Sequence, residues 1–409
     1  DQRHRIHAPS GLDADSSDCS ANVVKAHYTI ALQNLKPAHV HFPAATFCGT
    51  TLIADIGIDL GLLKMSNPPR LITASEVHNL LSELPAATPQ AHKGKRGHVL
   101  VIGGSSGKFG AVRLSGEGAL RSGAGLVTLV FPESAAREVA PTLEELMCEA
   151  LPEDEAGGFS GEGAIQELIA GKRAVVIGPG MGTSKGAAKL LKQVLQAVKV
   201  EGCNCIIDAD ALNLLSADED LLELMPQGTI LTPHPGEMSR LVKSDTQSIE
   251  CERVRVATEF SKKTGAIVIL KGARSVIASP DGDVRVNPAA LGALATAGSG
   301  DVLAGILGGF CAQLDNAFSA AVTGVFLHGA AAEILVEESS SSVGLLAGDL
   351  PKALARAVAR TSGVARNNVQ SANSRLVLPG SFPDRILCGD QRSIAAMPLK
   401  PARQARGCC

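Results

Sequence analysis

The sequence predicts an α/β protein with a mostly parallel central sheet flanked by helices, and two observations support this prediction. Short runs rich in Val, Ile and Leu alternate with segments of helical periodicity over residues 93–362, which is typical of a largely parallel sheet. Apolar residues make up 45% of the 409 residues and charged residues only 19%, so the chain has enough apolar material for a large buried core.

The expected elements follow one another in a regular order. Strands are predicted over 98–103, 126–131, 174–177, 205–208, 229–232 and 266–270, and helices over 110–122, 185–199, 301–312 and 316–336. Pro280-Asp-Gly282 has the composition of a tight turn and predicts a hairpin after the last of these strands. Ligands of open α/β sheets bind beyond the carboxyl ends of the strands, so we expect a site in the loops that follow them.

The rest of the chain differs from this body in composition. Residues 1–62 alternate short apolar runs with Pro and Gly and end in a strand-like stretch, 51–55. Residues 63–92 hold several prolines around one short helical stretch and are predicted to be a linker to the domain at 93–362. Residues 363–409 gather Ser, Asn, Pro and Arg, and we expect a disordered tail, because this composition buries too little apolar area to offset the entropy of ordering.

Composition argues against nucleic-acid and membrane partners. The chain has one Tyr, no Trp and a formal charge of −3 without a long basic block, so it lacks the stacking surfaces and the cationic footprint of a nucleic-acid binder. No leader and no run of 18 apolar residues is visible. The ten scattered cysteines lack metal-site spacing and are expected to be reduced thiols. We therefore expect a cytoplasmic protein that acts on small molecules.

The strongest motif is Ala295-Thr-Ala-Gly-Ser-Gly-Asp301. Small residues run into an apolar helix, so the backbone amides of Gly298, Ser299 and Gly300 can approach an anion at the positive end of the helix dipole. Asp301 falls in the first helical turn, where a carboxylate can accept the proton of a hydroxyl that attacks phosphorus. In the alternative interpretation, Asp301 only favours the helix dipole and the glycines only form a turn.

Two further motifs follow strands. In Lys271-Gly-Ala-Arg-Ser275 a lysine at a strand end precedes Gly, which suits contact with a nucleotide phosphate or ribose, although an ordinary exposed strand end looks the same. In Thr232-Pro-His-Pro-Gly-Glu237 two prolines stiffen the loop. Pro235 and Glu237 are also ordinary helix-starting residues, whereas placing the His234 imidazole there serves no obvious folding need. We therefore expect His234 to contact a ligand.

Two glycine-rich loops and a pair of carboxylates complete the set. Residues 103–107 and 178–182 look like places where the backbone approaches a ligand, although neither fits the spaced dinucleotide fingerprint well. Asp208 and Asp210 stand at a strand end, where they could bind Mg²⁺ through water or hydrogen-bond a substrate. Equally, Asp210 could simply cap the next helix. Because every motif follows a strand, we expect them to converge on one rim.

In this order the motifs resemble those of the NAD(P)H-hydrate dehydratase family, over nearly all of residues 93–360. The matching stretches are His98-Val-Leu-Val-Ile-Gly-Gly-Ser105, Arg121-Ser-Gly-Ala-Gly-Leu-Val127, Ile177-Gly-Pro-Gly-Met-Gly182, Asp208-Ala-Asp-Ala-Leu-Asn213, Thr232-Pro-His-Pro-Gly-Glu237, Lys271-Gly-Ala273, Ala297-Gly-Ser-Gly-Asp-Val-Leu303 and Gly344-Leu-Leu-Ala347. The combination of the His-containing loop with Gly-Ser-Gly-Asp is specific, since other ribokinase-like kinases share mainly the second motif. Lys108 stands where the family usually has Tyr, and Leu291-Gly292 replaces a frequent Asn-Pro.

The resemblance implies a ribokinase-like fold and a nucleotide-dependent lyase that dehydrates (S)-NAD(P)H hydrate, with ADP the expected donor rather than ATP and Mg²⁺ bridging its phosphates. It implies that Asp301 is the catalytic residue and faces the substrate hydroxyl. Residues that would line the hydrated nicotinamide nucleotide are Ala111, Gly180 and His234. Residues that would hold the adenine nucleotide are Lys271, Gly272, Ala273, Arg274, Ser275, Gly298, Ser299 and Gly300. Relatives commonly assemble, so a homo-oligomer is expected.

Residues 9–58 resemble the last third of an NAD(P)H-hydrate epimerase domain. Pro9-Ser-Gly-Leu-Asp-Ala-Asp15, Leu35-Lys-Pro37 and Ala54-Asp-Ile-Gly-Ile58 support this match. The resemblance implies that residues 1–62 are an incomplete Rossmann-like remnant of a bifunctional repair protein. His7 falls where that family has a carboxylate, so we expect no epimerase activity.

Two other functions remain open on the sequence. A vitamin-precursor kinase of the same fold, such as a hydroxymethylpyrimidine or hydroxyethylthiazole kinase, would share the Gly-Ser-Gly-Asp loop and release a stable phosphate ester. A catalytically inactive nucleotide-binding protein would fit the incomplete first domain and the change at Leu291-Gly292. The products of turnover separate these three functions.

Overall fold

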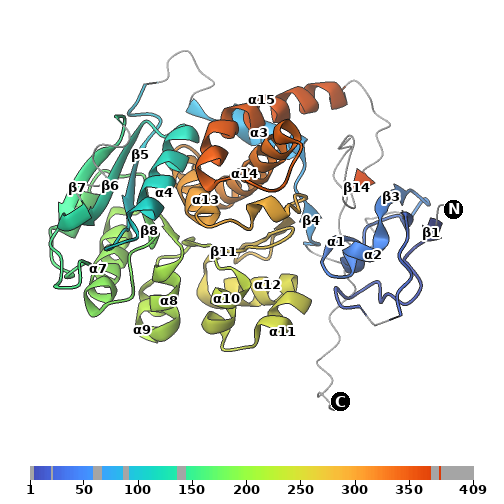
Figure 1. Ribbon diagram of the computed structural model, residues 1–409, viewed down its shortest axis with the longest axis horizontal. Coiled ribbons are helices and arrows are strands. Elements are labelled where there is room, and N and C mark those ends of the chain that lie inside the picture. The colour runs from blue at the N-terminus through green and yellow to red at the C-terminus, as the bar shows by residue number, and fades with distance from the viewer. Residues whose placement is uncertain are drawn as a thin grey trace. The chain divides into compact units, whose positions relative to one another are not determined.

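The computed structural model describes residues 4–19, 22–58, 67–85, 92–135, 144–369 and 377–378. The chain forms two compact units, and the boundary between them falls between Arg70 and Leu71 (Figure 1). Val377 and Leu378 belong to the first unit. The second unit contains all of the motifs of the expected dehydratase domain.

The first unit is built on a small sheet in the order β1-β2-β3-β14. Its elements are β1 (His4–Ile6), β2 (Tyr28–Leu32), α1 (Pro37–Val40), α2 (Ala45–Cys48), β3 (Thr50–Ala54) and β14 (Val377–Leu378). The first three strands are parallel and β14 is antiparallel to β3. Ala31, Val40 and Ile53 are buried, so this part of the chain has a small apolar core of its own. The predicted strand at 51–55 is β3.

The second unit is built on a ten-stranded sheet in the order β4-β13-β12-β11-β10-β9-β8-β5-β6-β7. The strands are β4 (Arg70–Leu71), β5 (His98–Ile102), β6 (Leu126–Pro132), β7 (Met147–Leu151), β8 (Ala174–Ile177), β9 (Asn204–Ile207), β10 (Ile230–Leu231), β11 (Ile267–Leu270), β12 (Val276–Ala278) and β13 (Val284–Val286). Every pairing from β11 to β7 is parallel. The predicted hairpin is β12–β13, which pairs antiparallel. The predicted α/β class with a mostly parallel sheet is confirmed.

Helices cover both faces of this sheet (Figure 1). One face carries α3 (Ala74–Ser82), α4 (Phe109–Arg121), α13 (Ser299–Cys311), α14 (Ala317–Ser339) and α15 (Leu350–Val369). The other carries α7 (Lys185–Glu201), α8 (Asp210–Ala217), α9 (Glu219–Leu224), α10 (Pro235–Val242), α11 (Thr246–Cys251) and α12 (Arg253–Thr264), while α6 (Ile165–Ile169) packs against α7. Three short 3₁₀ turns are η3 (Glu133–Ala135), η4 (Gly292–Leu294) and η5 (Ala347–Asp349).

The most apolar helices, α13 and α14, lie in the core rather than on the surface. α14 is long and apolar enough to cross a membrane by length and composition, but 72% of its most apolar window is buried. α13 packs so closely on α4 that a Cβ atom added to Gly305 would lie 1.8 Å from the carbonyl oxygen of Ser115. Their apolar character is therefore explained by packing within the domain and gives no reason to place a subunit interface there.

The structure corrects the linker predicted over residues 63–92. Within that range lie Leu71 of β4 and the whole of α3, and Ile72, Val77 and Leu81 belong to the same apolar core as α13 and α14. Val77 and Leu81 are four residues apart, so they lie on one face of the helix and bury it. The surrounding prolines suggest a linker, but this segment is part of the second domain.

Several elements of the second unit are not among those predicted from the sequence, and two of them lie at the limits of the sheet and of the domain. β7 forms the edge of the sheet, and α15 continues to Val369, so the domain boundary predicted at 362 lies inside a helix. The disordered tail predicted over 363–409 lies outside the described residues from 370 onward, apart from Val377 and Leu378.

Candidate active site

Five neighbouring parallel strands end at the same edge of the sheet, and the loops after them contain the predicted site residues. In the order β11-β10-β9-β8-β5, these loops are 271–275, 232–237, 208–213, 178–182 and 103–111. α13 begins beside them, because a Cβ atom added to Gly300 would lie 3.2 Å from Lys271 Nζ and 3.7 Å from Asp208 Oδ2. The motifs therefore converge on one rim, as the sequence predicts.

The loop before α13 exposes backbone rather than side chains. Gly298 has a φ of 89° and is the N-cap of α13, a conformation that favours glycine. A Cβ atom there would lie 2.6 Å from Leu114 Cδ1 and 3.2 Å from Ala347 Cβ. The Ser299 hydroxyl donates to the carbonyl of Leu294 at 2.7 Å, and so fixes the start of the helix against η4. The Ser299 amide donates to the carbonyl of Thr296 at 3.3 Å, so an anion at this helix start would be bound by the amides that follow it, beginning with that of Gly300.

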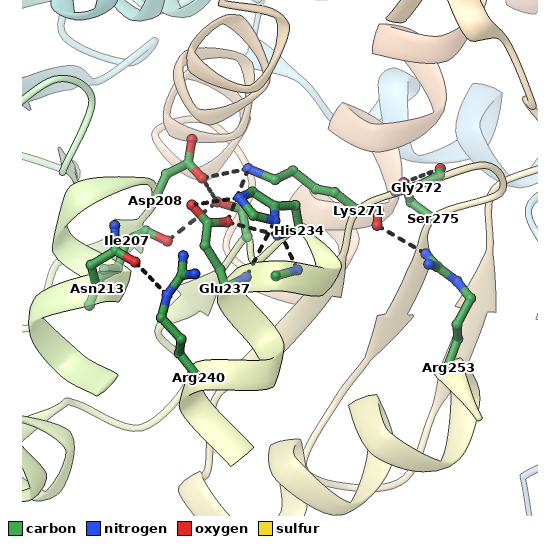
Figure 2. A network of polar contacts seen from close by, with 12 residues as sticks. Ile207, Asp208, Asn213, His234, Glu237, Arg240, Arg253, Lys271, Gly272 and Ser275 are labelled. Carbon is green, nitrogen blue, oxygen red and sulfur yellow. Dashed lines mark hydrogen bonds and ion pairs between the residues drawn. The ribbon is translucent and has the colours of Figure 1, made fainter. Parts of the chain in front are cut away.

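Lys271 pairs with carboxylates beneath this loop (Figure 2). Its Nζ lies 2.7 Å from Asp208 Oδ1 and 3.9 Å from Glu237 Oε2. Burial alone would lower the pKa of Lys271, but the two carboxylates more than offset it and hold the pKa above its usual value. The Thr232 hydroxyl donates to the same oxygen, Asp208 Oδ1, at 2.6 Å. Lys271 is therefore a fixed positive charge directly below Gly300.

His234 has a role in folding that the sequence does not lead us to expect. It is the N-cap of α10, and its Nδ1 accepts hydrogen bonds from the amides of Gly236 and Glu237 at 3.0 and 3.3 Å. The Glu237 carboxylate accepts from the amide of His234 at 2.8 Å, which completes a capping box. The expectation that the imidazole serves no folding need is wrong, because a ring nitrogen caps a helix as well as a side-chain oxygen does.

The cap also sets the state of the imidazole ring. Because Nδ1 accepts two hydrogen bonds, the proton of a neutral ring is on Nε2. Burial, together with the nearby cations Lys271 and Arg240, lowers the pKa of His234, so the ring is neutral at physiological pH. The side chain is 53% exposed. Its Nε2 lies 3.6 Å from Glu237 Oε1, so a ligand acceptor would compete with that carboxylate for the Nε2–H while Nδ1 holds the helix.

Asp301 lies in the first turn of α13, as predicted, and is partly buried. Burial, followed by the carboxylate of Asp208, raises its pKa to about 7, with smaller contributions from Asp210 and Glu237, while Lys271 opposes the rise. A carboxyl group with this pKa can both accept and return a proton near neutral pH. Such tuning by burial and neighbouring charge is common in catalytic groups.

Two of the three residues assigned to the substrate side, Ala111 and Gly180, lie together. A Cβ atom on Gly180, whose φ is 62°, would lie 3.1 Å from Ala111 Cβ and 2.7 Å from the carbonyl oxygen of Lys108. The carboxylate of Asp210 accepts from the amide of Gly182 at 2.9 Å and pairs with Lys108 Nζ at 3.3 Å. The alternative in which Asp210 caps the next helix is wrong, since the N-cap of α8 is Ala209 and has no side-chain cap bond.

The loop after β11 is pinned from two sides. Arg253 on α12 donates to the carbonyls of Leu270 and Lys271 at 2.9 and 3.1 Å (Figure 2). Gly272 has its amide near the Ser275 hydroxyl, at 3.3 Å. Arg274 is buried and its amide donates to the carbonyl of Ala289, whereas Gly272 and Ala273 are exposed. Gly272 and Ala273 are therefore exposed, while the residues on either side of them are held in place by hydrogen bonds.

Sequence reasoning did not single out three residues that support the site: Thr232, Arg253 and His328. Thr232 is part of a recognised motif, so its position could have been noticed. His328 on α14 is buried, and its Nε2 lies 3.1 Å from the carbonyl oxygen of Ser299. Burial lowers its pKa to about 4, so it supports the loop as a neutral ring. No local pattern around His328 or Arg253 in the sequence indicates these contacts.

The part of the chain that the structure describes contains no cluster of three or more His, Cys, Asp or Glu residues able to hold a metal ion. Magnesium is commonly held by one or two carboxylates together with substrate phosphates and water. The carboxylates at this rim are compatible with that mode of binding, in which the ion arrives with a nucleotide rather than residing in a protein cage.

Comparisons with known proteins agree on one family. The family model of NAD(P)H-hydrate dehydratase matches residues 99–356. The bifunctional NAD(P)H-hydrate repair enzyme of Moorella thermoacetica is 38% identical over 348 residues, covering 84% of this chain and 64% of the relative. The ADP-dependent (S)-NAD(P)H-hydrate dehydratase of Xanthomonas campestris is 38% identical over 285 residues, covering 69% of this chain and 94% of the relative. This chain thus spans about two thirds of the bifunctional relative and nearly all of the single-function one.

Solved structures agree with the fold. The ADP/ATP-dependent NAD(P)H-hydrate dehydratase from Bacillus subtilis, co-crystallised with ATP and Mg²⁺, has a TM-score of 0.61 at 31% identity and covers 73% of this chain and 100% of its own. A ribokinase-like superfamily protein from Enterococcus faecalis has a TM-score of 0.63 at 24% identity, over 72% of this chain and 96% of its own. The fold is ribokinase-like, as expected from the motifs, and the chain belongs to the NAD(P)H-hydrate dehydratase family.

Proposed function

We propose that this protein is an ADP-dependent lyase that dehydrates (S)-NAD(P)H hydrate to NAD(P)H. The observation that supports this proposal most strongly is the position of Asp301, a carboxyl group with a pKa of about 7 in the first turn of a helix, where the N-terminal end suits an anion. The same combination of a base and an anion site would serve phosphoryl transfer to a substrate hydroxyl.

In the first step, the ring hydroxyl of the hydrate attacks the terminal phosphorus of ADP. Asp301 takes the hydroxyl proton as the new O–P bond forms, and AMP leaves as the old P–O bond breaks. In this proposal the amides of Gly298 and Gly300 bind the transferring group, while that of Ser299 donates to the carbonyl of Thr296. Lys271 is a fixed cation beside Gly300. Catalysis of this step is therefore mainly positioning and electrostatic stabilisation.

In the second step, the phosphate ester is eliminated. A hydroxyl is a poor leaving group and a phosphate is a good one, so the C–O bond breaks with its electrons going to phosphate. The departing phosphate takes a proton from the neighbouring carbon, and the electrons of that C–H bond form the C=C bond that restores the dihydronicotinamide ring. Mg²⁺ carried by the nucleotide would neutralise charge on the phosphates. Asp301 then returns its proton to solvent or to the released phosphate.

The substrate ring is held, in this proposal, by residues on three loops. His234 donates from Nε2, since its Nδ1 is occupied by the helix cap. Ala111 and Gly180 pack against each other with room for no larger side chain between them, and so form a flat surface beside the reacting centre. Gly272, Ala273, Arg274 and Ser275, with Lys271 at the base of the loop, form the adenine-nucleotide side.

The test is to incubate the full chain with hydrated NADH, Mg²⁺ and either ADP or ATP, and to follow the absorbance of the reduced nicotinamide ring. We expect recovery of NADH with release of one AMP and one phosphate per ring restored when ADP is the donor. A stable phosphate ester in place of NADH would instead identify a kinase of the same fold. Nucleotide binding without any turnover would identify an inactive binding protein.

For the first unit, we propose an epimerase-like domain segment in which His7 stands in place of the family's carboxylate, so that these residues support no epimerase activity. The parallel order of β1, β2 and β3 supports a Rossmann-like origin, and the match to the Moorella enzyme covers a larger share of this chain than the dehydratase model does. Incubation with the (R) hydrate alone tests this proposal, because conversion to the (S) form beyond the spontaneous rate would contradict it.

Assembly and location stay predictions. A homo-oligomer is expected from the family resemblance, and light scattering of the purified chain measures its mass directly. A cytoplasmic location, with small molecules rather than nucleic acid or a membrane as partners, is expected from composition alone. Fractionation of cells that express the full protein tests this expectation.

A further inference from the structure

Lys108 lies where three loops of the proposed substrate side meet. Its carbonyl oxygen would lie 2.7 Å from a Cβ atom on Gly180, and its amine lies 3.3 Å from Asp210 Oδ2. Asp210 Oδ2 also accepts a hydrogen bond from the amide of Gly182 at 2.9 Å. Lys108 immediately precedes α4, whose third residue, Ala111, is assigned to the substrate. One lysine side chain thus reaches across the loops that follow β5, β8 and β9.

The space around this amine is open. A Cβ atom added to Gly107 or Gly110 would meet no atom within 4 Å, and one on Gly182 would meet only the Ser105 side chain, at 3.8 Å. The Lys108 side chain is 54% exposed. The amine can therefore turn from Asp210 toward a ligand without displacing packed protein atoms.

The charge around the site requires such a cation. Carboxylates of Asp208, Asp210 and Glu237 all act on Asp301, and a dinucleotide substrate brings negative phosphates toward them. Lys271 does not serve the substrate side, because its amine is held at 2.7 Å by Asp208 and its side chain is only 19% exposed. Without another cation on that side, the carboxylates would repel the substrate.

Among the described residues, Arg240 is another exposed cation near the site. Arg240 on α10 donates from Nε to Asn213 Oδ1 at 3.0 Å, and its charge acts on His234 and Glu237. It therefore stands on the His234 side of the site. Lys108 adjoins the contact between Ala111 and Gly180.

We propose that Lys108 is a specificity-determining residue that binds a phosphate oxygen of the dinucleotide substrate, exchanging its contact with Asp210 for the ligand. A lysine amine is a mobile point charge suited to such an exchange. This inference rests on the proposed function for the identity of the substrate. It predicts opposite effects for the two members of the ion pair, since Asp210 competes with the phosphate for the same amine.

The experiment measures equilibrium binding of NADH and NADPH to the full chain, followed by the fluorescence of the reduced ring. Lys108→Met is expected to raise the Kd about three- to tenfold, as loss of one charged contact would, and Lys108→Arg to restore most of the affinity. Asp210→Asn, which can still accept from the Gly182 amide, is expected to bind as tightly as the wild type or more tightly. Lys199→Met, at an exposed position in the last turn of α7, is the matched control and should bind like the wild type.

Comparing the Kd values of NADH, NADPH and reduced nicotinamide mononucleotide shows which substrate phosphate Lys108 contacts. If Lys108→Met weakens NADH and NADPH equally but leaves reduced nicotinamide mononucleotide unchanged, the contact is to the pyrophosphate or adenosine side that only the dinucleotides have. If only NADPH is weakened, the contact is to the 2′-phosphate. An equal rise in the Kd of all three ligands would place the Lys108 contact at the phosphate on the nicotinamide ribose. In each case the difference between variant and wild type should shrink as salt is added.

Equal weakening by Lys108→Met and Asp210→Asn would overturn the proposal, because it would show that the pair merely holds the loops together. An unchanged Kd in Lys108→Met for all three ligands would overturn it as well. These outcomes are separate from failure of the proposed function. A wild type that binds the dinucleotides but restores no hydrate would refute the lyase and leave the Lys108 result standing.

Discussion

Asp301 must be ionised to act as a base, but its surroundings disfavour a negative charge. Burial and the carboxylate of Asp208 push the pKa up, and Lys271 pulls it back, with a result of about 7. Two neighbours of opposite charge, Asp208 and Lys271, therefore shift the pKa of Asp301 in opposite directions. Because those neighbours also pair with each other, their separate effects on Asp301 can be measured only by changing one at a time.

This balance predicts a pH profile. If Asp301 must be ionised to accept a proton, kcat/KM rises with pH through about 7 and levels off above it. Asp208→Asn removes a repelling charge, lowers the pKa of Asp301 and moves this rise to lower pH. Lys271→Met removes the attracting charge and moves it to higher pH. The measurement is kcat/KM against pH for the three proteins, and shifts in the same direction would contradict the assignment.

His234 carries two functions on its two ring nitrogens, and one pair of variants separates them. His234→Ala loses the helix cap and the ligand donor, so we expect a loss of about 1 kcal/mol in stability together with weaker substrate binding. His234→Asn restores a good N-cap and should recover the stability without recovering the affinity. Denaturant unfolding and the KM for the hydrate measure the two effects. A normal KM in His234→Asn would show that the imidazole acts only as a cap.

At the scale of elements, the close contact between α4 and α13 fixes the helix that carries the anion loop. A Cβ atom on Gly305 would lie 1.8 Å from the carbonyl oxygen of Ser115, and backbone cannot give way as a flexible side chain can. We expect Gly305→Ala to cost about 1–3 kcal/mol and to displace the start of α13, so that the Kd for ADP rises as well.

The control for this prediction is Gly363→Ala on α15, where a Cβ atom would meet nothing within 4 Å. In the middle of a helix the change from Gly to Ala is expected to stabilise by about 0.5–1 kcal/mol. Thermal unfolding of both variants gives the comparison. If Gly305→Ala were as stable as the wild type, α4 and α13 would not be packed as closely as described.

The elements that the sequence predicts well are those with a long apolar period or a run of β-branched residues. β5, β8 and α7 are recognised within two residues at either end. β7 is missed because it is an edge strand of the sheet, in which Met147, Glu149 and Ala150 are exposed and Glu149 interrupts the apolar run expected of a central strand. α15 buries small residues such as Ala353 and Ala357, whose helical spacing is easily overlooked beside larger apolar groups.

The site is predictable for a different reason, which belongs to the whole molecule. In a parallel sheet the carboxyl ends of neighbouring strands meet, so polar loops after five strands must converge. The convergence of these loops follows from the sheet topology, but the topology does not indicate which side chains contact each other there. Nothing local in the sequence indicates that Thr232 bonds to Asp208, that Lys108 pairs with Asp210, or that His328 reaches the carbonyl of Ser299, because each contact joins elements far apart in the chain.

The limits of the domain are also a property of the whole molecule, and they can be tested. Ile72 lies in the segment predicted as a linker but is only 1% exposed and packs in the main core. Ile72→Ala should therefore cost about 2–5 kcal/mol and Ile72→Val about 1 kcal/mol. Thermal or denaturant unfolding measures both. A linker residue would show no loss in either variant.

The proposed chemistry requires the carboxylate of Asp301 to meet the substrate hydroxyl while the amides beside it hold the phosphoryl group. The most direct measurement is the rate of NADH recovery from the hydrate in Asp301→Asn, with ADP binding measured on the same sample. We predict a fall of at least about 10²–10³-fold in turnover with ADP affinity and unfolding temperature near those of the wild type. Turnover close to the wild-type rate in a folded, ADP-binding Asp301→Asn would contradict the account.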